Sequence, residues 1–285
     1  MLEGMNVIYL LSLCYNLFLS VHLNGPYFLF PDWVTWLFLL WGMAAQTGGS
    51  IEGVALAYKF GWAINLGGGF HNASARYGYN RSAYCDLRLA INCARNNHWG
   101  EWALIINTNA QFGAGLADEF RESSRVFICD IFNPQAAPVS STRLARVNVA
   151  QAVTPAENDD AYLSKCKFKI SDAISVSYPD FIIYIAGYDM VAQDWYGGMK
   201  INENTIVQRD EYVMLTCLAR QTPVLMLIGD SYSSTSLIIA NSIWNLLYKA
   251  QISNAPIKFP TADMYGARQG LRADMLPWTT KMINF

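Results

Sequence analysis

Short runs of aliphatic and β-branched residues alternate with longer segments of helical period from about residue 60 onward. This alternation is typical of a mainly parallel sheet covered by helices. We expect strands at residues 60–66, 102–107, 125–131, 180–186 and 223–228. Apolar residues three or four positions apart predict helices at 83–96, 159–176, 203–219 and 237–250. The predicted fold class is α/β, with three layers and a mainly parallel central sheet flanked by helices.

The chain is long enough for one large core, and we predict a single domain over residues 1–285 with a C-terminal tail at 251–285. Charged residues make up only 15% of it, and the formal net charge is -2. No run of lysine and arginine suited to a phosphate backbone occurs. We therefore expect no direct nucleic-acid partner.

Two apolar stretches near the N-terminus, residues 6–23 and 33–45, raise the question of a signal peptide or membrane anchor. The first lacks a basic start, contains Asn16 and Ser20, and is marginal against the roughly 20 residues of a spanning helix. The second is too short to span. We expect both to be core helices and no membrane association.

The cysteines show no spacing typical of a metal site, which favours reduced thiols in an intracellular protein of the nucleus or cytoplasm. There are six: Cys14, Cys85, Cys93, Cys129, Cys166 and Cys217. Histidines are scarce, because only His22, His71 and His98 occur. This scarcity limits acid–base chemistry at neutral pH.

Segments that follow predicted strands are where ligands bind in such sheets, beyond the carboxyl ends of the strands. We expect four of them to lie at one rim. They are Gly67-Gly68-Gly69-Phe70-His71-Asn72, Asn107-Thr108-Asn109-Ala110-Gln111-Phe112-Gly113, Ala186-Gly187-Tyr188-Asp189 and Gly229-Asp230-Ser231-Tyr232.

These segments, in this order, resemble the active-site segments of the histone deacetylases, a family with an arginase/deacetylase-like fold. The resemblance is to the class IV branch, covers residues 9–247, and begins at Tyr9-Leu10-x-x-Leu13. The family's first strand and helix have no counterpart here, so we expect the sheet to lack an edge element. Further phrases that carry the resemblance are Gln46-Thr47-Gly48-Gly49, Gly61-Trp62-Ala63-Ile64-Asn65, Ala83-Tyr84-Cys85-Asp86, Leu89-Ala90-Ile91, Gly197-Gly198 and Arg209-Asp210-Glu211.

The family holds a catalytic zinc with two aspartates and a histidine, and the matching positions here are Asn109, Gln111 and Asp189. Neutral amides are poor zinc ligands, so the resemblance predicts weak or absent zinc. Asp189 is either a residual metal contact or a loop carboxylate that caps the strand end.

The family's tandem histidines match His71 and Asn72, and the aspartate that orients the first histidine matches Asn107. An amide does not titrate, so position 72 cannot act as acid or base. Taken without the family, His71 after a glycine-rich turn is more often structural than catalytic. Tyr232 matches the family's oxyanion-stabilising tyrosine, with a structural hydrogen-bonded tyrosine as an equal alternative.

The family's acyl-lysine channel has a phenylalanine wall at the position of Arg81, with Gly69 and Phe70 also at the channel. An arginine there either blocks the channel or swings outward. Two rival interpretations have weaker signals. The glycines at 67–69 lack the spacing of a phosphate-binding loop. Ser231 as an esterase nucleophile lacks a histidine after His98.

Two functions follow from these residues. The first is a catalytically impaired pseudoenzyme of the class IV type with a binding or scaffold role, whose partners include chromatin or other regulatory proteins. The second is an active zinc-dependent lysine deacetylase or defatty-acylase, a hydrolase whose partner is an acyl-lysine protein or peptide. The replaced ligands, the missing second histidine and Arg81 favour the first.

Overall fold

A six-stranded, entirely parallel sheet forms the centre of the protein, with the strand order β1-β6-β5-β2-β3-β4. The computed structural model describes residues 32–79 and 82–252. The α/β class predicted from the sequence is confirmed. The strands are β1 (Trp62–Asn65), β2 (Ala103–Asn107), β3 (Val126–Phe132), β4 (Val149–Ala152), β5 (Phe181–Ala186) and β6 (Val224–Ile228).

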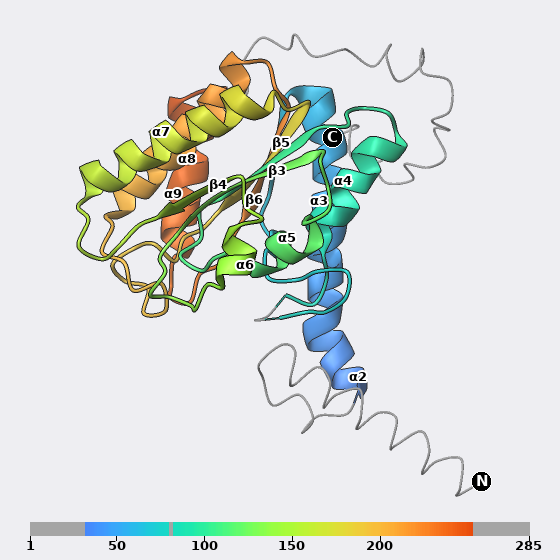
Figure 1. Ribbon diagram of the computed structural model, residues 1–285, viewed down its shortest axis with the longest axis horizontal. Coiled ribbons are helices and arrows are strands. Elements are labelled where there is room, and N and C mark those ends of the chain that lie inside the picture. The colour runs from blue at the N-terminus through green and yellow to red at the C-terminus, as the bar shows by residue number, and fades with distance from the viewer. Residues whose placement is uncertain (1–31, 80–81, 253–285) are drawn as a thin grey trace, which may run out of the picture.

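Helices cover both faces of the sheet and complete the three layers (Figure 1). Successive strand residues point to opposite faces, so Leu104 and Ile106 pack into one core and Ala103 and Ile105 into the other. One layer contains α3 (Trp41–Phe60), α4 (Asp86–Asn96) and α5 (Ala114–Glu119). The other contains α7 (Asp159–Ser177), α8 (Glu203–Ala219), α9 (Ser236–Trp244) and the π-helical turn η3 (Asn245–Lys249). Three shorter elements are α2 (Asp32–Thr35), η2 (Trp36–Leu40) and α6 (Ser141–Leu144).

The predicted strands and helices are confirmed with small shifts at their ends, and two details differ. Phe60 was expected in a strand but is the last residue of α3, because Gly61 ends that helix at a left-handed φ of 87°. Strand β4 was not predicted. It is a four-residue edge strand whose side chains are all at least partly exposed, so it lacks the apolar run of the inner strands.

The prediction that residues 33–45 are a core helix is wrong for part of this segment. Leu40 is buried, but Trp41 is 58% exposed. Figure 1 shows this end of α3 extending beyond the sheet, away from the strands that the structure describes. Within residues 32–79 and 82–252, no helix has the length and apolarity needed to cross a membrane. The other apolar stretch, 6–23, lies outside the described residues.

The cysteines of the described ranges are all free thiols. Cys129, Cys166 and Cys217 are buried in the layer of α7 and α8, and Cys85 and Cys93 are partly buried. Burial raises the pKa of the Cys166 thiol to about 11, so it stays protonated at neutral pH. Cys14 lies outside the described residues.

Candidate active site

The turn after β1 presents His71 at the carboxyl edge of the sheet. Gly68 and Gly69 adopt φ values of 76° and 71°, a conformation that favours glycine. The buried carboxylate of Asp86 accepts the N–H groups of Gly69 at 2.8 Å and Phe70 at 3.0 Å, and the hydroxyl of Ser50 at 2.7 Å. Burial raises the pKa of Asp86 although these donors act against the shift. The Asp86 carboxylate thus holds the backbone of the turn that precedes His71.

The last residue of β2 and the segment after it carry three buried amides, Asn107, Asn109 and Gln111. The amide of Asn107 donates to Asp130 Oδ1 at 3.0 Å, and its oxygen accepts from Asn109 Nδ2 at 2.5 Å. Asn109 Oδ1 accepts the backbone N–H of Asp230 at 2.7 Å. Both ends of the Asn109 side chain are therefore committed to hydrogen bonds within the protein.

Asn109 is also closely surrounded by backbone. A Cβ at Gly187 would lie 2.5 Å from Asn109 Cα, and one at Gly229 would lie 2.4 Å from Asn109 Oδ1. Both glycines follow strands that flank the site, so their lack of a side chain lets the strand ends close on Asn109.

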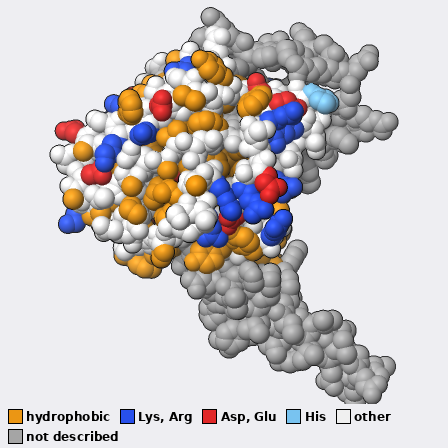
Figure 2. Space-filling model, viewed as in Figure 1, with side chains coloured by type: hydrophobic (Ala, Val, Ile, Leu, Met, Phe, Trp, Pro, Cys, Tyr) orange, Lys and Arg blue, Asp and Glu red, His pale blue; other side chains and the backbone are white. Residues whose placement is uncertain are grey.

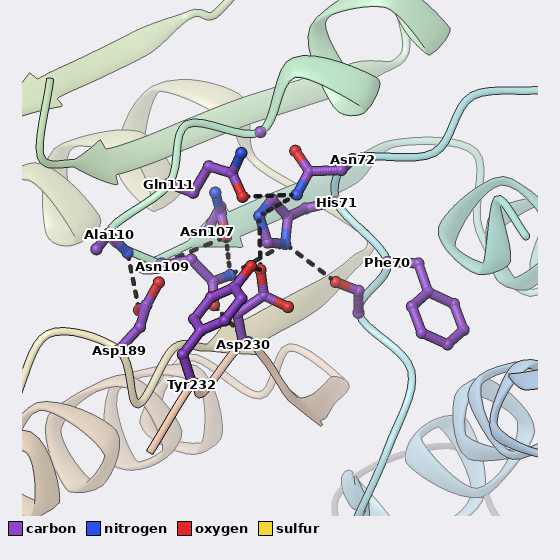
Figure 3. A network of polar contacts seen from close by, with 12 residues as sticks. Phe70, His71, Asn72, Asn107, Asn109, Ala110, Gln111, Asp189, Asp230 and Tyr232 are labelled. Atoms are coloured by element: carbon purple, nitrogen blue, oxygen red, sulfur yellow. Dashed lines mark hydrogen bonds and ion pairs between the residues drawn. The ribbon is translucent and has the colours of Figure 1, made fainter. Parts of the chain in front are cut away.

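His71, Asn72 and Gln111 form a chain of hydrogen bonds beside this pair (Figure 3). Asn72 Nδ2 lies 3.1 Å from His71 Nε2 and donates to Gln111 Oε1 at 3.1 Å. His71 Nδ1 lies 3.3 Å from the carbonyl of Gly69. With the proton on Nδ1, this nitrogen donates to Gly69 and Nε2 accepts from Asn72; with the proton on Nε2, Nδ1 instead accepts from Asn109 Nδ2, which lies 3.3 Å away.

Asp189 follows β5 and is fully buried. Its Oδ1 accepts the backbone N–H of Ala110 at 2.8 Å, whereas Oδ2 accepts no hydrogen bond from the described residues. Burial, followed by the negative charge of Asp230, raises the pKa of Asp189 well above its usual range. The preceding Tyr188 anchors this segment, since its hydroxyl donates to the buried Asp210 at 2.9 Å.

The segment after β6 brings Asp230 and Tyr232 to the outer side of the site (Figure 3). Asp230 Oδ2 lies 3.6 Å from His71 Nε2 and accepts the Tyr232 hydroxyl at 3.2 Å. The backbone N–H of Tyr232 donates to Asp194 Oδ2 at 2.7 Å. A carboxylate beside the histidine was not predicted, because Asp230 was named only as part of a rim segment and was given no role of its own. The available signal was its position two residues before a rim tyrosine.

The donor set does not fit a zinc ion. No cluster of three or more histidine, cysteine, aspartate or glutamate side chains suited to a metal occurs in the described ranges. At two of the three family ligand positions, the amide oxygens of Asn109 and Gln111 already accept hydrogen bonds from Asp230 and Asn72. Only Asp189 keeps a free carboxylate oxygen, and one carboxylate is too few for a zinc site.

The structure thus brings His71, Asn72, Asn107, Asn109, Gln111, Asp189 and Tyr232 together at one rim, as predicted (Figure 3). Of the channel positions, Gly69 is buried in the turn, the ring of Phe70 points away from the polar cluster, and Arg81 lies outside the described residues. The hydroxyl of Ser231 lies 2.5 Å from that of Thr235 and donates to the carbonyl of Ser233. These contacts give no support to a serine nucleophile.

Comparisons with known proteins show what the chain is similar to. The model of the family described as "Histone deacetylase domain" matches residues 34–247. The chain is 32% identical over 233 residues to "Histone deacetylase 2" of Arabidopsis thaliana, covering 81% of this chain and 60% of that protein. It is 28% identical over 206 residues to an uncharacterized protein of Picosynechococcus, covering 71% of this chain and 64% of that protein. The chain therefore spans less than two thirds of the length of these curated relatives.

Proposed function

The chain belongs to the histone deacetylase family, and on that premise we propose that it is a non-catalytic member of the class IV type that binds or scaffolds a partner. One observation carries the proposal. Asn109 and Gln111 stand where the family has zinc ligands, and their oxygens are already hydrogen-bonded within the protein. A metal there would have to displace these bonds and would gain only neutral oxygen donors in return.

Proton transfer is impaired independently of the metal. Asn72 stands where the family has a second histidine, and its amide cannot give or take a proton at neutral pH. His71 remains, with Asn107 in place of the aspartate that orients it in the family. The carboxylate nearest to the imidazole in this structure is Asp230, which approaches Nε2 from the rim. The imidazole is thus held differently from a general base that faces an attacking water.

The proposed partners are proteins, among them chromatin or other regulatory proteins. We place the protein in the nucleus or the cytoplasm, because Cys85, Cys93, Cys129, Cys166 and Cys217 are free thiols, as in proteins of reducing compartments. The rim offers a partner several exposed or partly exposed groups, including Trp195, whose indole N–H donates to the carbonyl of Tyr232.

A second candidate is an active zinc-dependent lysine deacetylase or defatty-acylase. It is supported by the persistence of His71, Asp189 and Tyr232 at three strand ends. A specific observation favours it as well: Asp189 Oδ2 is a buried acceptor without a hydrogen bond from the described residues. Buried polar atoms normally have a partner, so this oxygen is a position where a cation or a donor would be stabilised.

Zinc content and acyl-lysine hydrolysis separate the two candidates. We expect the purified chain to retain substoichiometric zinc by elemental analysis after dialysis, and to release no acyl group from acetyl-lysine or myristoyl-lysine peptides. The matched variants are Asp189→Ala at the site and Asp172→Ala, an exposed carboxylate on α7. Stoichiometric zinc with turnover that is abolished by Asp189→Ala and kept by Asp172→Ala would refute the non-catalytic proposal.

A further inference from the structure

A polar pocket of about 710 Å³ opens beside the candidate active site, between the segment that follows Asn72, helix α5 and helix α6. Figure 2 shows arginine and carboxylate side chains gathered over α5 and α6 on this face. The volume lies within the range of small-molecule sites, roughly 300–1,000 Å³. The lining consists of Ser74, Ala75, Arg76, Tyr77, Arg88, Asp118, Glu119, Arg121, Glu122, Ser140, Thr142, Arg143 and Arg146.

The described residues that line the pocket carry an excess of positive charge, since they include five arginines and three carboxylates. Asp118 organises one wall. It accepts the Tyr77 hydroxyl, Arg143 Nε at 2.9 Å and Arg146 Nη1 at 2.6 Å. These bonds hold both guanidinium groups in defined positions, which lowers the entropy cost when they bind a further anion.

The other three arginines of the lining, Arg76, Arg88 and Arg121, have N–H groups that no ion pair within the described residues uses. The exposed guanidinium of Arg76 makes no ion pair with a carboxylate of the described residues. Arg88 uses Nη1 alone to reach Glu119, and Arg121 pairs with its sequence neighbour Glu122 at the surface. Each guanidinium carries five N–H groups in a planar fork that matches phosphate oxygens.

We propose that this pocket binds a phosphorylated sugar or similar phosphorylated polyol. The arginines supply bidentate donors for the phosphate groups. The carboxylates and the hydroxyls of Ser140 and Thr142 supply partners for hydroxyl groups of the ligand. Among the described residues of the lining, the only aromatic ring is that of Tyr77, whose hydroxyl is bonded to Asp118, so these residues offer little to a nucleobase. A lining made mostly of charged and hydroxyl side chains matches a strongly polar ligand.

The site requires neither zinc nor catalysis, so it stands independently of the function proposed above. It is nonetheless linked to the candidate active site. Glu119 accepts the backbone N–H of Ala75 at 2.5 Å, and the N–H of Leu116 donates to the carbonyl of His71 at 3.2 Å. Helix α5 therefore joins the pocket to the segment that carries His71 and Asn72.

Isothermal titration of the whole chain tests the proposal, with fructose 1,6-bisphosphate as the probe. We expect saturable 1:1 binding at about 0.15 M salt, and about 10-fold or more weaker binding after Arg76→Gln or Arg121→Gln, since each removes charge-assisted hydrogen bonds. Both side chains are at the surface, and thermal melting confirms that the variants fold. The matched control is Arg125→Gln, which removes an exposed arginine outside the lining and leaves binding unchanged.

Fructose, inorganic phosphate and a phosphoserine peptide complete the comparison. Absence of binding to fructose and weaker binding to inorganic phosphate are the expected results, because the pocket is proposed to recognise both parts of the ligand. The proposal is overturned by no binding of the bisphosphate at millimolar concentration, or by binding that the Arg76 and Arg121 substitutions leave unchanged. It is also overturned if inorganic phosphate or the phosphopeptide binds as tightly as the bisphosphate.

Discussion

Restoring the family's ligands at positions 109 and 111 tests the interpretation of the site most directly. The double variant Asn109→Asp/Gln111→His adds a carboxylate and an imidazole to the retained Asp189. The free energy of zinc binding at a structural site with four ligands is about 10–16 kcal/mol in favour of binding, or about 3 kcal/mol for each ligand. Two added ligands then give about 6 kcal/mol, which corresponds to about 10⁴-fold tighter zinc binding than in the unaltered chain.

The surroundings of Asn109 decide whether this gain is realised. One oxygen of the new carboxylate can still accept the N–H of Asp230, which in the unaltered chain lies 2.7 Å from Asn109 Oδ1. Its second oxygen would face Asn107 Oδ1, which lies 2.5 Å from Asn109 Nδ2. Rotation of the Asn107 amide by half a turn removes this repulsion and presents an oxygen to Asp130 instead. Asp130 can then donate in its protonated form, because burial raises its pKa to about 7.

Zinc affinity is measured by competition with a chromogenic chelator and by elemental analysis after dialysis. The triple variant that also carries Asp189→Ala is the control, and it should lose most of the gain. If the unaltered chain binds zinc as tightly as the double variant, the amides are functional ligands and the reasoning is refuted. If the double variant folds but gains no affinity, the geometry of the rim has departed too far from a zinc site.

Three further predictions concern stability, each measured as the free energy of unfolding in urea. The folded protein keeps the proton of Asp130 up to about pH 7, whereas the unfolded chain releases it near pH 4. Stability should therefore fall by up to about 4 kcal/mol as pH rises through this window, with a smaller slope in Asp130→Asn. Asp210→Ala should cost about 4 kcal/mol, because it leaves the buried guanidinium of its sequence neighbour unpaired. Gly115→Ala should cost about 2 kcal/mol, since its Cβ would lie 2.4 Å from the backbone of Asn72, whereas Gly48→Ala in α3 has open space.

The inner strands and the residues at their carboxyl ends were predictable because both follow from local rules. Strands such as those at 102–107 and 180–186 are apolar on both faces because helices cover both faces of the sheet. In a parallel sheet, the polar residues that follow such strands all lie at the carboxyl edge of the sheet. The edge strand β4 and the exposed start of α3 were not predictable, since both depend on how far the sheet extends. Trp41 is apolar, yet it lies beyond the strands that would bury it.

Sequence analysis predicted which residues form the site better than it predicted which of them contact one another. The carboxylate of Asp230, in the segment after β6, reaches His71 although it lies 159 positions later in the chain, a pairing that only the fold specifies. The same holds for the arginine pocket. Its members come from four separate segments, and none of them forms a basic run.

The amides at this rim lower the electrostatic cost of the site when no metal is bound. A carboxylate at position 109 would lie in a buried site close to Asp189 and Asp230, and an unpaired buried charge costs about 3 kcal/mol or more. Bound zinc would neutralise such a charge, but Asn109 avoids it and keeps the hydrogen bonds to Asp230 and Asn107. It follows that the Asn109→Asp/Gln111→His variant, kept free of zinc, should be less stable than the unaltered chain and should recover stability when zinc is added. Equal stability of the two metal-free proteins would contradict this account, because it would mean that the amides do not relieve an electrostatic cost.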